Sequence, residues 1–171
     1  TERHGMVSVL FADIEGFTMI SDSINPERLI DSLDRFFFNL DDIIKRHDLE
    51  KIKTIGDAYM CAGGVPKHNH TNPIDAVLAA LEMQEHMKRL NLATHSGDNS
   101  WGLRIGVNTG KVISGVVGRD NLSYDIWGSG VNLASRMESS GEAGRVNISY
   151  YTHMLVKDFF DCTCRGEMPV K

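Results

Sequence analysis

The feature that most constrains the fold is residues 50–60, which predict a hairpin of two short strands. Ile55 ends the first strand, Gly56 and Asp57 supply the turn, and Ala58 begins the second strand. A hairpin tip is a costly place for a carboxylate unless water, a cation or backbone donors receive it. The segments on either side of the hairpin therefore decide both the fold and the role of this turn.

Two predicted helices with the same kind of start flank the hairpin. Each begins at an Asn-Pro pair, in which asparagine caps the helix and proline takes the first helical position. Apolar residues at helical spacing predict one helix over residues 26–46 and another from Asn72 to about Leu90. Residues 6–12 form a mostly apolar run before the first helix, which predicts a buried strand.

The second half of the chain adds further strands. Residues 93–100 are polar and predict an excursion, and residues 101–107 alternate like a strand. Residues 112–117 predict a second arm that turns back around Gly110. The order strand, helix, hairpin, helix, strand predicts an α+β protein with a ferredoxin-like βαββαβ core, followed by additional C-terminal strands and helices. Because this fold serves many functions, the function must come from individual residues.

Size and composition predict one cytoplasmic domain, residues 1–171, and exclude several kinds of partner. The net charge of -5 and the lack of a basic block argue against nucleic acid. No apolar run approaches the roughly 18 residues of a membrane span, and no secretory signal precedes Val7. Three sparse cysteines are typical of a reducing cytosol. We expect the chain to be part of a longer protein, truncated near the C-terminal edge of the domain, which carries an unknown regulatory domain and could be membrane-anchored.

Two carboxylates are candidates for metal binding. Asp13 follows the first predicted strand and Asp57 lies at the hairpin tip, so the predicted topology brings both to one end of the sheet. Two convergent carboxylates suit a pair of divalent cations, because Mg²⁺ typically takes one or two carboxylates together with substrate phosphates. The alternative is that both are ordinary turn or cap residues.

Two further groups of residues fit a nucleotide. Gly16 lets the backbone approach a ligand at the start of a predicted short helix, whose amides can cradle phosphates. Residues 130–138 predict a helix on which Asn132 and Arg136 share one face. That pair suits a ribose and a phosphate, although a solvent-exposed face with a surface arginine would have the same pattern.

Residues 11–18, 53–60 and 124–137 together resemble the signature segments of class III nucleotidyl cyclase catalytic domains, of the homodimeric adenylyl cyclase type. The likeness runs from about Val7 to Lys171, and three such segments in this order are highly specific. The resemblance implies that the ribose 3′-hydroxyl of ATP attacks the α-phosphorus, which yields 3′,5′-cyclic AMP and pyrophosphate.

The resemblance also implies a role for each matching residue. Asp13 and Asp57 would hold two Mg²⁺ or Mn²⁺ ions, assisted by the carbonyl of Ile14. Arg136 would stabilise charge at the α-phosphoryl group, and Asn132 would orient the ribose. Contacts with the substrate phosphates are implied for four residues: Gly16, Phe17, Thr18 and Lys171.

The base-binding residues by this resemblance are Lys53 and Asp125. Adenine offers an amino donor and a ring acceptor on its pairing edge, and a carboxylate and an ammonium match them. Guanine reverses both functions, and each buried unmatched group costs about 1–3 kcal/mol. Cyclases that use GTP tend to carry Glu and Cys at these positions, so the sequence favours ATP.

Three alternatives remain at this point. A guanylyl cyclase is disfavoured by Lys53 and Asp125. A catalytically weak, cyclase-like regulatory dimer would be expected to lack a metal aspartate, the asparagine or the arginine. A polymerase-palm or diguanylate-cyclase type of enzyme would share the layout and two acidic ligands, but would not explain Asn132 and Arg136. By the resemblance, the pockets lie at a homodimer interface, so that Asp57 serves one pocket and Lys53 the other.

Overall fold

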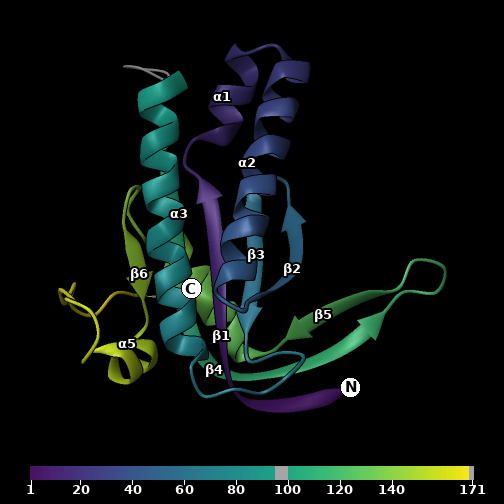
Figure 1. The fold of residues 1–171 in the computed structure, drawn as a ribbon, viewed down its shortest axis with the longest axis vertical. Coiled ribbons are helices and arrows are strands. Elements are labelled where there is room, and N and C mark those ends of the chain that lie inside the picture. Colours follow the sequence, from purple (N-terminus) through teal and green to yellow (C-terminus); the bar gives the residue numbers. More distant parts are fainter. Residues whose placement is uncertain (95–99, 170–171) are drawn as a thin grey trace.

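A mixed sheet forms the centre of the molecule (Figure 1), in a computed structural model that describes residues 1–94 and 100–169. In chain order the elements are β1 (Glu2–Ile14), α1 (Phe17–Ser23), α2 (Pro26–Arg46), β2 (Glu50–Ile55), β3 (Ala58–Gly63), α3 (Asn72–Thr94), β4 (Leu103–Val117), β5 (Ser123–Trp127), α4 (Ser129–Ser139), β6 (Val146–Ile148) and α5 (Tyr150–Val156).

The strands lie side by side in the order β2-β3-β1-β4-β5, and β6 pairs with β4. All pairs along this path are antiparallel, whereas β6 runs parallel to β4. The order β4-β1-β3-β2 is that of a ferredoxin-like βαββαβ unit, to which β5, α4, β6 and α5 are added. The predicted α+β fold class is confirmed.

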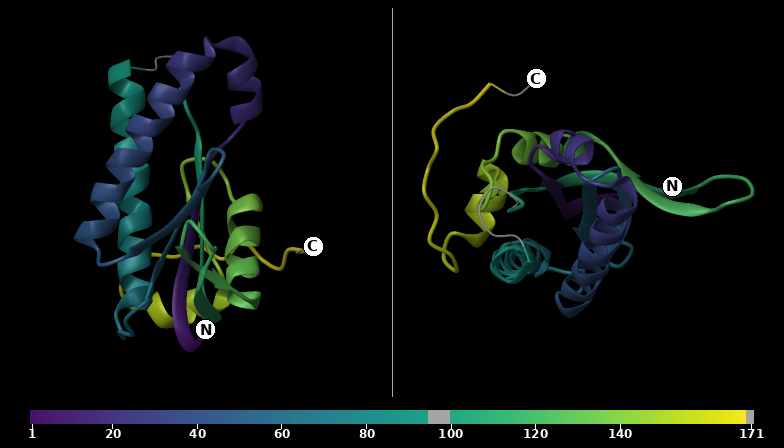
Figure 2. Two further views of the ribbon diagram at one scale, coloured as in Figure 1. Left: turned by 90° about the vertical axis from the view of Figure 1, so that its right-hand side faces the viewer. Right: turned by 90° about the horizontal axis from the view of Figure 1, so that it is seen from above.

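The sheet separates two apolar layers, because successive residues of a strand face opposite sides. On β1, Leu10, Ala12 and Ile14 belong to the large cluster with α2 and α3. Val7 and Val9 belong to a smaller cluster with Ala134 of α4. Figure 2 shows α2 and α3 on one side of the sheet and α4 on the other. Asp13 lies between Ala12 and Ile14 in the sequence, so its side chain is directed to the α4 side.

Most predicted elements lie where the sequence places them. The hairpin reverses at Gly56-Asp57, as expected. Helix α2 has the predicted limits, and its Asn25 side chain accepts a hydrogen bond from the amide of Glu27. Helix α3 runs to Thr94, four residues beyond the prediction. The predicted capping role of Asn72 is wrong, because Asn72 is already the first helical residue and its Oδ1 accepts from the amide and hydroxyl of Ser8. The expected excursion at 93–100 falls largely on residues 95–99, which lie outside the described residues.

The predicted reversal around Gly110 is wrong. The chain runs straight through this glycine, so that β4 is one strand from Leu103 to Val117. Gly110 pairs with Val7 of β1, and this cross-strand partner holds the segment in the sheet. The reversal comes later, between β4 and β5, where Gly118 takes a positive φ of 106°.

Among the described residues, no helix is both long enough and apolar enough to span a lipid bilayer.

Candidate active site

Asp13 and Asp57 meet at one end of the sheet because of the strand register. Asp13 is the last but one residue of β1 and pairs with Ala58, the first residue of β3. Asp57 precedes Ala58 in the tight turn, where Gly56 takes a positive φ of 58°. The two carboxyl groups lie close enough for each to shift the pKa of the other. The convergence predicted from the sequence is therefore present in the structure.

Asp13 and Asp57 lie so close together that a negative charge on one carboxyl group disfavours ionisation of the other. Burial, followed by the hydrogen bond and charge of Asp13, raises the pKa of Asp57 to about 7. Burial also opposes ionisation of Asp13, but hydrogen bonds from its carboxyl neighbours and the charge of Arg104 lower the pKa of Asp13 below its usual range. In the absence of a cation, Asp13 is thus the more readily ionised acid of the pair, and Asp57 is only partly ionised at neutral pH.

Two residues beside Asp13 were missed by the sequence analysis. Arg104 is the cross-strand partner of Asp13 on β4, and its Nη2 lies 3.4 Å from Asp13 Oδ2. Glu138 of α4 places its Oε2 3.7 Å from the same Nη2. Burial and then Asp13 raise the pKa of Glu138 to about 8. No local sequence signal points to either residue, because Arg104 reaches Asp13 through the register of β1 and β4, and Glu138 through the way α4 crosses the sheet.

Asp13 and Asp57 fit a divalent cation. Asp13 Oδ1 is buried without a hydrogen-bond partner, which is the state of an oxygen directed at a missing ligand. Carboxylate and carbonyl oxygens suit Mg²⁺ and Mn²⁺, and the carbonyl of Ile14 is next in the chain. Among the described residues, no group of three or more His, Cys, Asp and Glu side chains is arranged to hold a metal ion. A bound ion would therefore depend on these two carboxylates and on oxygens of the substrate.

Lys53 and Asp125 form a second, separate group. Lys53 Nζ donates to Asp125 Oδ2 at 2.8 Å, although the two residues lie 72 positions apart. The Asp125 side chain is 13% exposed and the Lys53 side chain 43% exposed, so the ammonium group can still reach solvent or a ligand. A carboxylate and an ammonium held side by side form one acceptor and one donor for a planar ligand edge.

A β-bulge in β2 directs Lys53 to this position. The ladder pairs Lys51 with Cys61 and Lys53 with Met60, so that Ile52 is an extra residue. Residues two apart on a regular strand share a face, but here the bulge separates the two lysines. Lys51 binds Asp41 of α2 at 3.0 Å, while Lys53 binds Asp125 on the α4 side.

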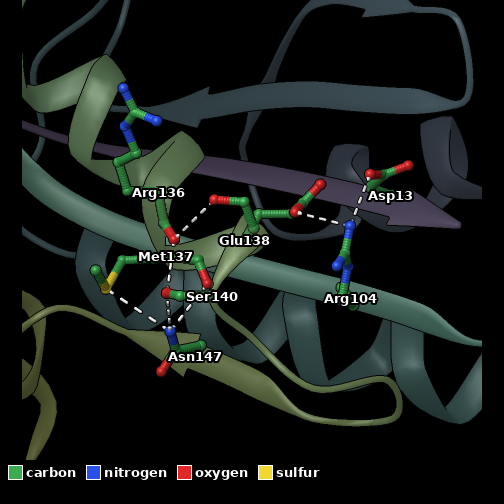
Figure 3. Close-up of polar contacts among 8 residues, drawn as sticks. Asp13, Arg104, Arg136, Met137, Glu138, Ser140 and Asn147 are labelled. Atoms are coloured by element: carbon green, nitrogen blue, oxygen red, sulfur yellow. Dashed lines mark hydrogen bonds and ion pairs between the residues drawn. The ribbon is translucent and has the colours of Figure 1, made fainter. Parts of the chain in front are cut away.

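Helix α4 carries Asn132 and Arg136, and both residues are exposed, as expected for a ligand-facing pair and equally for a solvent-facing one. Figure 3 shows the Arg136 side chain directed away from Asp13 and Arg104, whereas Glu138 on the same helix is directed towards them. The two residues are about 200° apart around the helix, which explains their opposite directions. The Arg136 side chain is therefore directed away from the acidic residues around Asp13 of its own chain.

Three of the four predicted phosphate-binding residues, Gly16, Phe17 and Thr18, lie among the residues that the structure describes. Gly16 takes a positive φ of 70° and caps α1, whose first turn contains Phe17 and Thr18 and no acidic residue. The first amides of a helix lack partners within the helix, so these amides are open to an anion. Lys171 lies outside the described residues.

Comparisons with known proteins agree with this picture. Over residues 1–171 the chain matches the family described as the adenylate and guanylate cyclase catalytic domain. It is 39% identical over 173 residues to an adenylate cyclase of Mycobacterium tuberculosis (strain ATCC 25618 / H37Rv), an alignment that covers 99% of this chain and 38% of that protein. The chain therefore spans well under half of this relative's length.

Two solved structures resemble the fold closely. The adenylyl cyclase CyaB from P. aeruginosa has a TM-score of 0.91 and 33% identity, over 99% of this chain and 90% of that chain. The guanylate cyclase domain of RhGC from Catenaria anguillulae, in complex with GTP, has a TM-score of 0.88 and 36% identity, over 94% of this chain and 87% of that chain. Adenylyl and guanylyl cyclases are thus both among the similar proteins. From its full-length match and its fold, the chain belongs to the adenylate and guanylate cyclase catalytic domain family.

Proposed function

We propose that this cyclase domain converts ATP to 3′,5′-cyclic AMP and pyrophosphate. The observation that carries the choice of ATP is the 2.8 Å contact between Lys53 Nζ and Asp125 Oδ2. Asp125 supplies an acceptor for the amino group of adenine, and Lys53 supplies a donor for the neighbouring ring nitrogen. Guanine would present an oxygen to the carboxylate and an N–H to the ammonium group, and each such mismatch costs about 1–3 kcal/mol.

The reaction itself would use residues other than Lys53 and Asp125. Asp13 and Asp57, with the carbonyl of Ile14, would hold two Mg²⁺ or Mn²⁺ ions. When bound, these ions would supply an activated ribose 3′-hydroxyl and charge neutralisation for the triphosphate. Arg136 would stabilise the charge that develops on the α-phosphoryl oxygens, and Asn132 would orient the ribose.

The remaining phosphate contacts would come from the chain between β1 and α1 and from the C-terminus. The amides of Gly16, Phe17 and Thr18 would donate to phosphate oxygens, because the first turn of α1 leaves them without helical partners. Lys171 would bind the terminal phosphates.

We further infer a head-to-tail homodimer with two equivalent pockets. The support is the direction of Arg136, which is turned away from the carboxylates of its own chain (Figure 3). An arginine with this direction suits an α-phosphate held by Asp13 and Asp57 of another chain. Each pocket would then take its metal ligands from one chain and Lys53, Asp125, Asn132 and Arg136 from the other.

One assay tests the reaction and the choice of base together. The protein is incubated with Mn²⁺ and either ATP or GTP, and cyclic nucleotide and pyrophosphate are measured. We expect cyclic AMP from ATP and much less cyclic GMP from GTP. The absence of both cyclic products would contradict a cyclase, and a preference for GTP would contradict the role given to Lys53 and Asp125.

A double variant in the same assay isolates the base contacts. Lys53→Glu with Asp125→Cys removes the donor and acceptor that fit adenine, so we expect the preference for ATP to be lost by about 10²- to 10⁴-fold. Mn²⁺ binding should persist, because Asp13 and Asp57 are unchanged. Full retention of ATP selectivity in this variant would show that the base is recognised elsewhere.

A further inference from the structure

The carboxylate of Glu138 is held out of water beside the proposed metal ligands. Its side chain is 11% exposed, and the nearest cation is Arg104, whose Nη2 lies 3.7 Å from Glu138 Oε2. The same Nη2 lies 3.4 Å from Asp13 Oδ2, so one guanidinium group sits between two carboxylates (Figure 3). Burying the Glu138 carboxyl group without a polar partner would cost free energy, so the contact with Arg104 holds both side chains in place.

The backbone leaves Glu138 little freedom to move away. A Cβ added to Gly106 of β4 would lie 2.0 Å from the Glu138 nitrogen, so α4 rests directly on the strand. Gly106 and Arg104 are two residues apart and face the same side of β4, which places the guanidinium group next to the end of α4. On the far side, Asn147 Nδ2 donates to the carbonyl of Met137 at 2.9 Å and holds that end of the helix.

We propose that Glu138 is a positioning residue of the metal half of the active site, where it holds the Arg104 guanidinium group beside Asp13. Without the Glu138 carboxyl group, Arg104 would have only Asp13 beside it and would compete with a cation for that carboxylate. With Glu138 in place, the guanidinium group lies between two acidic side chains, and Asp13 keeps an oxygen for the ion. The orphaned Asp13 Oδ1 is that oxygen.

This inference rests on the proposed function and makes a prediction about which chain of the dimer matters. Glu138 serves the carboxylates of its own chain, whereas Arg136, two residues earlier, serves the other pocket. A heterodimer with one live pocket separates these roles. Its metal-donating chain carries Asn132→Ala/Arg136→Ala, and its arginine-donating chain carries Asp57→Ala.

The test is to place Glu138→Gln, which keeps the size of the side chain, on one chain at a time. On the metal-donating chain we expect cyclase activity to fall about 10- to 100-fold, as is typical when a group that orients a metal ligand is lost. On the arginine-donating chain we expect the activity of the parent heterodimer. Equal losses in both placements would indicate a purely structural role and overturn the proposal, as would no loss in either.

A binding measurement decides the matter independently of turnover. Calorimetry measures the Mn²⁺-dependent binding of α,β-methylene-ATP, which cannot be cyclised, to the Glu138→Gln homodimer. We expect affinity to fall about tenfold, while Glu142→Gln leaves it unchanged. Glu142 is a matched control because its side chain is 70% exposed and its ion-pair partner is Arg165, which has no role in the proposed site. The Arg165 Nη2 lies 3.7 Å from Glu142 Oε1. Unchanged affinity in Glu138→Gln would overturn the proposal, whereas an inactive parent heterodimer would instead refute the shared pockets.

Discussion

At the scale of single residues, the site is defined by carboxyl groups that compete for charge. Asp13 and Glu138 lie on either side of Arg104, Asp57 interacts with Asp13, and burial strengthens each of these interactions. One guanidinium group cannot neutralise three carboxylates. Two of the acids therefore retain protons well above their ordinary pKa values, and a divalent cation would displace those protons.

We expect this arrangement to make the metal-free protein lose stability as the pH rises. The folded state raises the pKa of Asp57 from 3.8 to about 7, so in that interval it binds a proton that the unfolded chain has released. The stabilisation is fully present below pH 3.8 and is lost as the pH rises through about 7. Glu138 acts in the same direction between 4.5 and about 8.

Thermal unfolding in EDTA and in Mn²⁺ measures this effect. Because Mn²⁺ must displace the protons, we expect it to raise Tm more at about pH 8 than at about pH 5. Asp57→Asn is the control, since an amide does not titrate and should reduce the pH dependence of the metal-free protein to the part contributed by Glu138. Equal Tm increases at both pH values, or an unchanged slope in Asp57→Asn, would contradict the assignment.

At the scale of elements, the contact between α4 and β4 sets the geometry of the site. Gly106 lies beneath Met137 and Glu138, and an added Cβ would lie 2.5 Å from the Met137 carbonyl carbon. Helix α4 also approaches β4 at its start, where Asn108 Nδ2 donates to the carbonyl of Gly130 at 3.0 Å. The helix that carries Arg136 and Glu138 is thus held against one strand at both ends.

Gly106→Ala is expected to displace α4. Because the neighbours of the new Cβ are backbone atoms, we expect a loss of about 1–3 kcal/mol in the free energy of unfolding, together with reduced cyclase activity. Gly5→Ala is a matched control on β1, since a Cβ there meets no heavy atom within 4 Å. Chemical denaturation of both variants measures the difference, and equal stability would show that α4 adjusts freely.

The elements also show which parts of the fold can be predicted from local sequence. The Asn25-Pro26 start, the apolar spacing of α2 and the Gly56-Asp57 turn act over a few residues, and each was located correctly. The Asn72 cap was predicted wrongly because the Asn72 side chain binds Ser8, 64 positions away. Gly110 misled the prediction because its partner, Val7, is more than a hundred positions away. The same reason hid Arg104 and Glu138, which reach Asp13 only through strand register and helix packing.

At the scale of the whole molecule, the candidate site residues of one chain form two separate groups. The proposed metal half lies at the meeting point of β1, β3 and β4, and the Lys53–Asp125 pair joins β2 to β5. Figure 1 shows β4 and β5 extending as an arm away from the helices. Exposed apolar side chains on this arm, including Val116 and Leu122, suit contact with a second copy of the chain.

If the domain is a homodimer with shared pockets, an inactive variant chain should restore activity to wild-type chain that has been diluted until its dimer dissociates. At concentrations where the wild-type chain dissociates, its specific activity should fall, because no monomer holds a complete pocket. Adding excess Asp57→Ala chain, which is inactive alone, should restore activity, since each mixed dimer combines wild-type aspartates with the variant's Asn132 and Arg136.

The matched control is a chain that carries Asp57→Ala together with Asn132→Ala and Arg136→Ala. It can pair with the wild-type chain but completes neither pocket, so its addition should restore no activity. Sedimentation velocity verifies that both variants form mixed dimers. If the two variants restore activity equally, or if wild-type specific activity is independent of dilution through dissociation, then each chain works alone and the direction of Arg136 has another cause.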